Sequence, residues 1–374
     1  MSACFLKVLN ISITAGWLIP AVVLLRFALK KAPKWVRCML WGIVALRLLL
    51  PFTIESRLSL LPSAEPVRTE SVAIQPADPQ TSPVLYEQVV LNSGFTAVDD
   101  AVNPVMEKTG TDGILSVETA AWVWVGGAGV MLLYAAASFL YMKHKVRVSI
   151  ETERNVFVCD DVRSPFILGT VRPKIYLPSG LDRQSREHIL AHERAHIRRL
   201  DHLWKPLGFL LLSIHWFNPL VWVAFLLLSR DIEFACDEKV VSQLDAEGKA
   251  SYSDTLLAFS RPHKAITVCP VAFGEVGVRQ RIKSVLCYRK SALWIVCIAL
   301  IAVTALSVCF LTAPKPVRTV EAVAAARTVP ALPLPKKLSV NRDEETRQPE
   351  AEEKKPSVYL YQMMSMQQLC DTAE

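Results

Sequence analysis

The chain has 374 residues, of which 52% are hydrophobic, and a formal net charge of +7 at pH 7. Its mean hydropathy of +0.29 excludes an ordinary soluble protein and favours an integral membrane protein embedded in a lipid bilayer. The nine cysteines are scattered without a C-x-x-C pair, so nothing in the sequence indicates a disulfide framework or a thiolate zinc site. The positive charge is no argument for nucleic-acid binding, because membrane topology accounts for it.

Four apolar runs are each close to the roughly 20 residues that cross a bilayer. They lie at 8–25, 38–54, 119–142 and 291–314. The first run follows a single basic residue, Lys7, and precedes no A-x-A site, so we expect a retained span and not a cleaved signal peptide. Arg47 lies within the second run and should face the bundle interior or water. The sequence therefore predicts four transmembrane helices.

Charge asymmetry between the loops predicts their orientation. The connection 26–37 has five basic residues and no acid, and a second basic cluster at 143–147 follows the third run, so both should face the cytoplasm. The loop 55–118 has ten acidic residues against three basic ones and suits the outside. The predicted order is two spans within 1–54, an extracytoplasmic loop at 55–118, a span at 119–142, a cytoplasmic domain at 143–290, a span at 291–314 and an extracytoplasmic tail at 315–374. Its richness in Pro, Ala, Lys and Glu makes that tail typical of disorder.

The cytoplasmic domain begins with strand-like pieces and continues with helices, which predicts an α+β fold. The expected strands are 146–150, 155–159, 165–168 and 174–177. Residues 169–172 could turn the last two into a hairpin. An edge of this sheet could accept an extended peptide as an additional strand.

Residues 192–196 read H-E-x-x-H on a helix predicted from residue 182 or 185 to about 199. Positions i and i+4 share a helix face, so His192 and His196 can turn ring nitrogens toward one metal ion. Glu193 is then placed to take a proton from the attacking water and deliver it to the leaving amine. The motif predicts zinc-dependent peptide hydrolysis, although two histidines and a glutamate on a solvated face are also compatible with five residues alone.

A third ligand has to come from another segment, and residues 230–238 offer two carboxylates at i and i+4 of a predicted helix. One could complete the coordination while the other hydrogen-bonds a ligand imidazole and fixes its tautomer. We assign Glu233 as the third zinc ligand and Asp237 as the carboxylate behind a ligand histidine.

The apolar stretch 207–228 is long enough to cross a membrane, but a crossing would separate Glu233 from His192 and His196. Asn218-Pro219 offers a break, because the residue before proline disfavours helix and proline is well accepted at a helix start. We therefore expect a hairpin of two helices, at 203–216 and 219–243. It would be buried against the domain core or dip shallowly into the bilayer.

Further short motifs accompany the zinc motif in order along about 160–285. They are Ser164-Pro165-Phe166, Gly169, Arg172 to Pro178, Arg199 and Asp201 after the zinc motif, Lys205, Asn218 to Trp222, Glu233 to Glu238, Tyr252 before Leu256, and Arg281-Ile282. This series resembles the BlaR/MecR-type antirepressor membrane metallopeptidases. The predicted protease domain between the third and fourth spans is also similar to that family.

The resemblance implies a gluzincin-like zinc metalloendopeptidase in a bacterial cytoplasmic membrane. It implies one zinc ion held by His192, His196 and Glu233, with Glu193 as the base. It also implies a cytosolic substrate such as a transcriptional repressor, cleaved in response to an extracytoplasmic signal. Antibiotic-sensing members carry an outer penicillin-binding domain with an S-x-x-K motif, which is not found after the fourth run here, so β-lactam sensing by this chain is not expected.

Two alternatives stay open: a membrane receptor or scaffold with a structural metal site, and a quality-control membrane protease. The sequence favours the enzyme, since a structural site has no need for a carboxylate at the second position of H-E-x-x-H. Tyr252, His215 and His263 are the candidates for stabilising the oxyanion. The sequence leaves the substrate, the inducing signal and the oligomeric state open.

Overall fold

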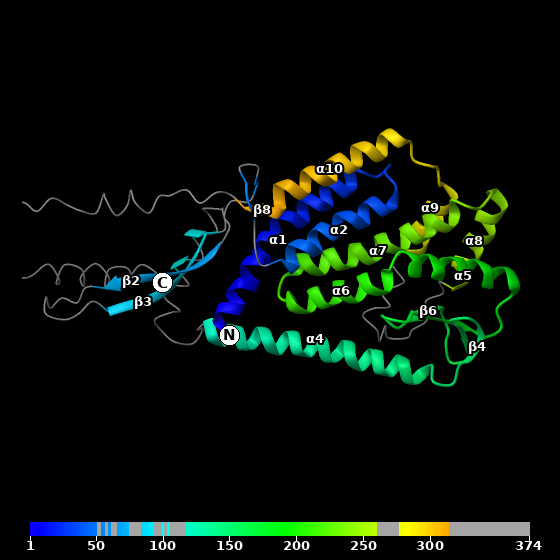
Figure 1. Cartoon of the computed structure of the whole chain (residues 1–374), viewed down its shortest axis with the longest axis horizontal. Coiled ribbons are helices and arrows are strands. Elements are labelled where there is room, and N and C mark those ends of the chain that lie inside the picture. The colour runs from blue at the N-terminus through cyan, green and yellow to red at the C-terminus, as the bar shows by residue number, and fades with distance from the viewer. Residues whose placement is uncertain are drawn as a thin grey trace, which may run out of the picture. The chain divides into compact units, whose positions relative to one another are not determined.

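The structure, a computed structural model, describes residues 1–50, 54–56, 59–60, 66–74, 84–92, 99–100, 103–104, 117–259 and 277–313. The predicted tail and His263 lie outside these residues. In the described part, long helices lie side by side and a small sheet lies at one end of them (Figure 1).

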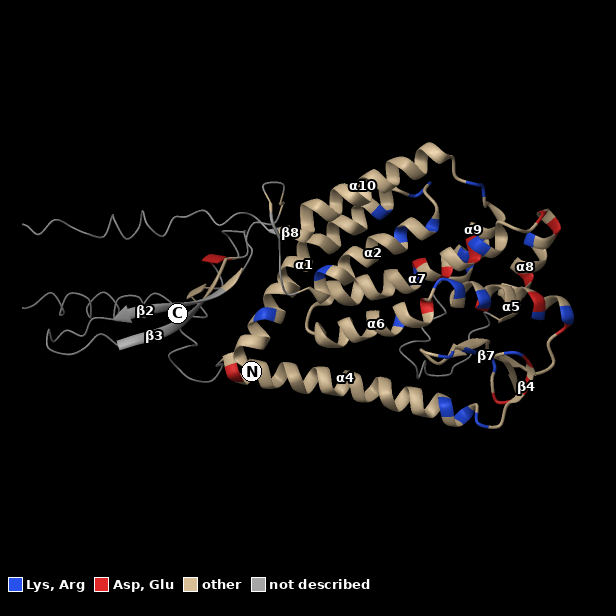
Figure 2. Cartoon of the chain, in the orientation of Figure 1, with Lys and Arg blue, Asp and Glu red and all other residues tan. Residues whose placement is uncertain are grey.

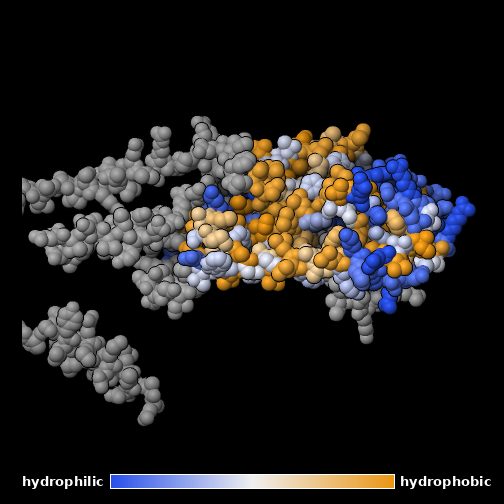
Figure 3. Space-filling model, turned by 60° about the horizontal axis from the view of Figure 1, so that its bottom comes forward, coloured by the Kyte–Doolittle hydropathy of each residue, from blue (hydrophilic) through white to orange (hydrophobic). Residues whose placement is uncertain are grey.

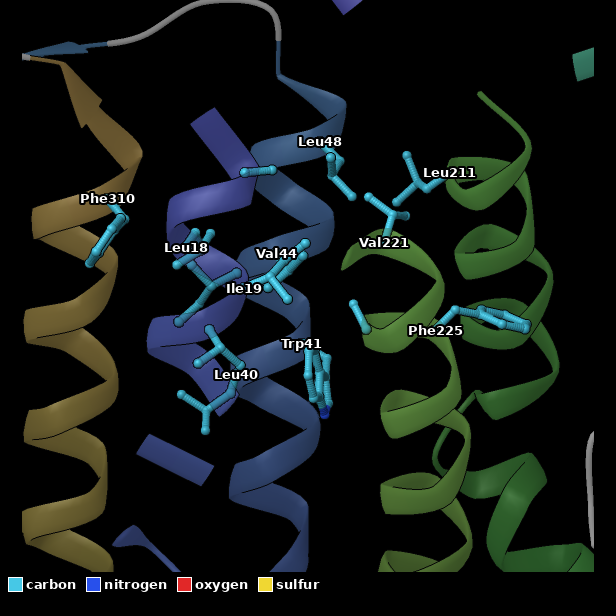
Figure 4. Close-up of a cluster of buried hydrophobic side chains, with 14 of the residues drawn as sticks. Leu18, Ile19, Leu40, Trp41, Val44, Leu48, Leu211, Val221, Phe225 and Phe310 are labelled. Carbon is cyan, nitrogen blue, oxygen red and sulfur yellow. The ribbon is translucent and has the colours of Figure 1, made fainter. Parts of the chain in front are cut away.

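Apolar helices from distant parts of the chain share one hydrophobic core. They are α1 (Ser2–Ala28), α2 (Lys34–Leu49), α6 (Asp201–Ile214), α7 (Pro219–Val241) and α10 (Leu293–Leu311). Figure 4 shows their side chains meeting between the ribbons, and Leu18, Leu40 and Leu212 within this core have no exposed surface. The core therefore joins the N-terminal helices to the segment that carries Glu233.

Three helices in the described part are long and apolar enough to cross a membrane: α1, α4 (Val117–Lys145) and α10. They fall on the predicted spans at 8–25, 119–142 and 291–314. The predicted second span falls on α2, which has only 16 residues and packs against α1, α7 and α10. Arg47 of α2 is buried and donates from Nη2 to Thr14 Oγ1 at 2.9 Å, so it faces the bundle interior as predicted.

The sides of these helices that face away from the core are apolar. On α4, Val130 is 67% and Leu133 is 71% exposed. Figure 3 shows a continuous apolar surface over the bundle, with hydrophilic residues gathered at one end. A soluble protein rarely exposes so large an apolar patch, and lipid chains would cover it.

The stretch 207–228 forms a hairpin and not a single span, which confirms the prediction. The Asn218 side chain caps α7 by accepting from Leu220 N at 2.9 Å, and Pro219 occupies the first helical position. At the tip, Asn218 Nδ2 donates to Ser12 Oγ at 2.9 Å and Trp124 Nε1 donates to the Ile214 carbonyl at 2.7 Å. The tip of the hairpin therefore packs against α1 and α4, which are two of the candidate spans.

A four-stranded sheet covers one side of α5 (Arg183–Arg198). Its strands are β4 (Ile150–Glu153), β5 (Val156–Cys159), β6 (Phe166–Leu168) and β7 (Lys174–Pro178), in the order β4-β5-β7-β6. The β6–β7 hairpin is the expected one, and Gly169 is required at its turn because its φ is +108° and a Cβ atom would lie 2.7 Å from the Arg172 carbonyl. The first strand begins at Ile150 and not at Val146, because Val146 is buried against Cys159 and Tyr176 just after α4 ends.

The loop predicted at 55–118 contributes β1 (Ile54–Glu55) and the antiparallel pair β2 (Val67–Ile74) and β3 (Val84–Leu91). β1 pairs in parallel with β8 (Thr312–Ala313), which directly follows α10. The loop and the end of α10 therefore lie at the same end of the bundle. Charged side chains gather at the opposite end, around α5, α8 (Ala246–Phe259), α9 (Val278–Leu286) and β4 (Figure 2).

Candidate metal centre

The two motif histidines share the buried face of α5. Asp182 begins this helix as its N-cap, with its carboxylate accepting from Ser185 N at 2.9 Å, which agrees with the predicted start. His192 and His196 are both buried, and their Nε2 atoms lie 3.1 Å apart. The i and i+4 spacing thus brings two imidazole nitrogens to one point.

Glu233 of α7 completes this cluster. Its Oε2 lies 3.5 Å from His192 Nε2 and its Oε1 lies 3.6 Å from His196 Nε2, and all three side chains are buried. Donor atoms about 2.0–2.1 Å from a tetrahedral zinc ion lie about 3.3 Å from one another. The separations in the cluster are close to that value, so the donor set fits a zinc ion.

The outer nitrogen of each histidine is held by a carboxylate. His192 Nδ1 lies 3.3 Å from Asp237 Oδ1 and 2.9 Å from the Tyr252 hydroxyl, which donates to Asp237 at 2.7 Å. His196 Nδ1 lies 2.9 Å from Asp201 Oδ2. Such contacts orient a metal-bound imidazole and leave its Nε2 atom facing the metal.

Asp237 therefore lies where the sequence predicted it, whereas Asp201 was not assigned a role. Asp201 begins α6 directly after Leu200, whose φ of +61° turns the chain back toward His196. Its position five residues after His196 in the recognised motif series was the available signal.

Two cations surround Glu233 and were also missed. Lys205 Nζ donates to Glu233 Oε1 at 2.9 Å, and Arg281 Nη1 lies 3.4 Å from Glu233 Oε2. Arg281 of α9 also donates to both oxygens of Asp237 at 2.8 Å. Burial raises the pKa of Glu233, but Lys205 and His196 outweigh burial and hold the pKa of this carboxyl well below its usual range. Glu233 is thus a carboxylate, the form that binds a metal.

His192 has a shifted pKa. Burial lowers it, but hydrogen bonds to Asp237 and Glu233 outweigh burial and raise the pKa of His192 to about 9. At neutral pH the metal-free centre consequently holds a proton on His192, and a metal ion has to displace that proton to bind.

A second group of possible ligands lies beside the first and consists of His196, Asp201 and Cys236. The Cys236 thiol donates to Asp201 Oδ2 at 3.2 Å. Burial and the nearby Asp201 and Glu233 carboxylates raise the pKa of this thiol well above its usual value. Since only a thiolate is a good ligand, the buried Cys236 thiol acts as a packing residue beside the cluster.

Glu193 is buried beside His192 on α5 and forms no hydrogen bond or ion pair with the described residues. Of the oxyanion candidates, Tyr252 contacts the centre, whereas His215 lies at the tip of the α6–α7 hairpin. His188, about 12 Å of helix rise from His196, contacts Ser251 Oγ at 3.1 Å and is not part of the cluster. The cluster thus combines three convergent donors with one buried carboxylate that has no other partner in the described chain.

Comparison with known families decides which class of protein this centre belongs to. The family described as BlaR1 peptidase M56 matches residues 6–285, which is most of the chain and includes the cluster and the bundle helices except α10. The chain belongs to this M56 peptidase family. The resemblance recognised from the sequence motifs is thereby confirmed, and the protein is a membrane peptidase by family.

Among curated proteins, the regulatory protein BlaR1 of Bacillus licheniformis is 29% identical over 161 residues, covering 37% of this chain and 27% of that protein. The methicillin resistance mecR1 proteins of Staphylococcus aureus and Staphylococcus epidermidis are 22% identical over 161 residues, covering 37% of this chain and 28% of each relative. The match thus spans about a quarter of the length of these relatives.

Proposed function

We propose that this M56 peptidase is a zinc metalloendopeptidase with one zinc ion per chain. The observation that carries the proposal is the convergence of His192, His196 and Glu233, from two helices, on a single point. Two imidazoles and a carboxylate are a frequent donor set of catalytic zinc, which keeps one position for water or substrate.

Each neighbouring residue has a defined task in this proposal. A bound zinc ion would make water acidic and polarise the scissile carbonyl. Glu193 accepts the proton of the attacking water and passes it to the leaving amine. Asp237 and Asp201 hold the two imidazoles in the tautomer that presents Nε2 inward. The Lys205 cation keeps Glu233 ionised, and Arg281 lies 3.4 Å from its other oxygen.

The substrate binds as an extended strand in this proposal. β4 and β6 are the edge strands of the sheet and have backbone groups available for pairing. β4 is attached to the zinc helix through Glu153, which accepts from Arg186 Nη2 at 2.9 Å and from Arg194 Nη2 at 3.2 Å. A strand added there would lie next to the helix that carries the H-E-x-x-H motif.

The centre faces the cytoplasm of a bacterial cell in this proposal. The basic connection 26–37 and the cluster at 143–147 lie at the same end of the bundle as the metal centre, and positive loops favour the cytoplasmic side. The loop 55–118 then lies outside, and residues 143–290 form the cytoplasmic domain. A signal received outside would reach the protease through the shared helix core.

The proposed substrate is a cytosolic regulatory protein, specifically a transcriptional repressor. The support is similarity to proteins named for regulation and for methicillin resistance. Cleavage of a repressor would convert the outside signal into gene expression.

The decisive experiment replaces Glu193 by Gln, which keeps the side-chain volume and removes the base. We expect the purified full chain to retain about one zinc ion and to lose cleavage by a factor of about 10²–10⁴. Retained cleavage would contradict the enzyme proposal, and retained signalling without cleavage would favour a receptor with a structural metal.

The same variant identifies the substrate by trapping. Capture of one regulatory protein, uncut, by the Glu193→Gln chain supports a dedicated antirepressor. Capture of many unrelated misfolded membrane proteins would instead indicate a quality-control protease.

A further inference from the structure

A basic cavity of about 760 Å³ lies at the charged end of the helix bundle, where Phe234 and Glu238 of α7 line it. It is open on one side and is bordered by the α1–α2 connection, by α9 and by the segment that leads into α10. Its basic lining residues, besides Arg37, are Lys30, Lys31, Lys34, Lys283, Arg289 and Lys290. Among the described residues of the lining, Glu238 is the only carboxylate.

Most of this positive charge is not neutralised by the protein. Arg37 pairs with Asp231 at 4.0 Å, and Glu238 Oε2 accepts from the backbone N–H of Lys34 at 2.6 Å. Lys30, Lys31, Lys283, Arg289 and Lys290 form no ion pair within the part of the chain that the structure describes. Like charges gathered around one cavity repel one another, so an anion bound there would stabilise the arrangement.

The surroundings of the cavity favour a lipid over a free anion. Phe234 and Ile295 add apolar surface to the lining. The adjoining start of α10 leaves Leu293 83% and Trp294 65% exposed. Since α10 is a candidate span, its first turns lie where headgroups meet acyl chains, and tryptophan is enriched at that level.

We propose that this cavity binds the phosphate headgroup of an anionic phospholipid, whose acyl chains lie along the exposed apolar face of α10. The lysines of the α1–α2 connection contact the phosphate from one side, and Lys283 of α9 and the basic residues that follow α9 contact it from the other. The Ser291 hydroxyl, which lies in the segment after α9 and donates to the Lys31 carbonyl at 3.1 Å, already joins these two sides of the cavity. The site does not depend on the peptidase activity.

Headgroup binding would also stabilise the position of α9, the helix that contributes Arg281 to the metal centre. Lys283 and Ser284 of α9 line the cavity, while Arg281 of the same helix binds Asp237. A bound headgroup therefore holds the helix whose arginine contacts the carboxylate behind His192.

The test is native mass spectrometry of the detergent-solubilised full chain with added phosphatidylglycerol, phosphatidylcholine or inorganic phosphate. One triple variant, Lys31→Gln/Lys283→Gln/Lys290→Gln, removes charge from the cavity. A matched variant, Lys143→Gln/Lys145→Gln/Arg147→Gln, removes the same charge at the same end of the bundle, after α4.

We expect the unmodified chain and the matched variant to prefer phosphatidylglycerol over phosphatidylcholine by at least about tenfold, and the cavity variant to lose that preference. Equal loss in both variants would overturn the proposal, because it would indicate general surface attraction. Absence of any preference, or displacement of the lipid by millimolar inorganic phosphate, would also overturn it. Circular dichroism checks the fold, and a single Lys283→Glu variant repeats the comparison if the triple variant loses helix.

Discussion

Helix α7 carries two buried polar clusters that differ in the groups that surround the carboxylate. At Asp231 a carboxylate meets donors: it accepts from Arg26 Nε and Nη2 at 2.6 and 2.7 Å and from Trp41 Nε1 at 2.9 Å. Two residues later, Glu233 meets two imidazole nitrogens, and all three groups present lone pairs to one point when the histidines are neutral. The first cluster is complete as it stands, whereas the second requires a proton or a cation at its centre. A buried charged residue alone therefore does not identify a metal site. The convergence of several lone-pair donors on one point does.

The largest expected effect is the loss of zinc from the His192→Ala variant, because one of three convergent donors is removed. Metal analysis of the purified full chain should find well under one zinc ion per chain. Cys236→Ala, a substitution in the neighbouring group of possible ligands, is the control and should retain about one. Equal losses in both variants would mean that the thiol takes part in binding.

The Asp231→Ala variant should disrupt the cluster of Asp231, Arg26 and Trp41 and leave zinc binding unchanged. Removing one partner of a buried ion pair leaves Arg26 uncompensated, which costs about 3–5 kcal/mol. Thermal unfolding in detergent should show a clear fall in Tm, while zinc content stays at about one per chain. Loss of zinc from the folded variant would show that the two clusters are not independent.

Asp201→Asn and Asp237→Asn should weaken the zinc site by a smaller amount. Each removes a carboxylate that orients an imidazole, and loss of such a partner lowers metal affinity about 10–100-fold. Competition with a zinc chelator measures the change. Asp231→Asn, on the same helix as Asp237 but outside the centre, is the control, and an equal weakening there would argue against an orienting role.

The smallest expected effect is that of a change of one pH unit on zinc affinity. Because the pKa of His192 is raised to about 9, zinc must displace one proton at any lower pH. Affinity should therefore rise about tenfold per pH unit as pH approaches 9 and level off above it. Asp237→Asn removes a hydrogen bond that raises this pKa, so its plateau should begin at lower pH. An unchanged plateau would show that Asp237 does not control the proton on His192.

Local sequence rules predicted the parts of the centre that depend on one helix. The Asp182 cap, the i and i+4 histidines and the Asn218-Pro219 break follow from backbone preferences, and the structure has all three. Glu233 was placed by combining these rules with the need for a third ligand on the same side.

Partners that depend on long-range packing were not predicted. Arg281 reaches Asp237 across 44 residues of sequence, and Lys205 reaches Glu233 across 28. Both residues belong to the recognised motif series, but their partners could not be read from residue type or spacing, because these contacts arise only when α9 and α6 pack against α7. The short α2 also depends on long-range packing, since α1, α7 and α10 cover one of its faces.

X-ray absorption spectroscopy of the zinc-loaded full chain tests the central claim most directly, because it reports the atoms bound to the metal. The account predicts two nitrogen ligands with oxygen ligands, all at about 2.0–2.2 Å, as expected for His192, His196 and Glu233. The spectrum should be unchanged in Cys236→Ala. A sulfur ligand at about 2.3 Å that disappears in Cys236→Ala would contradict the account and place the metal between His196, Asp201 and Cys236.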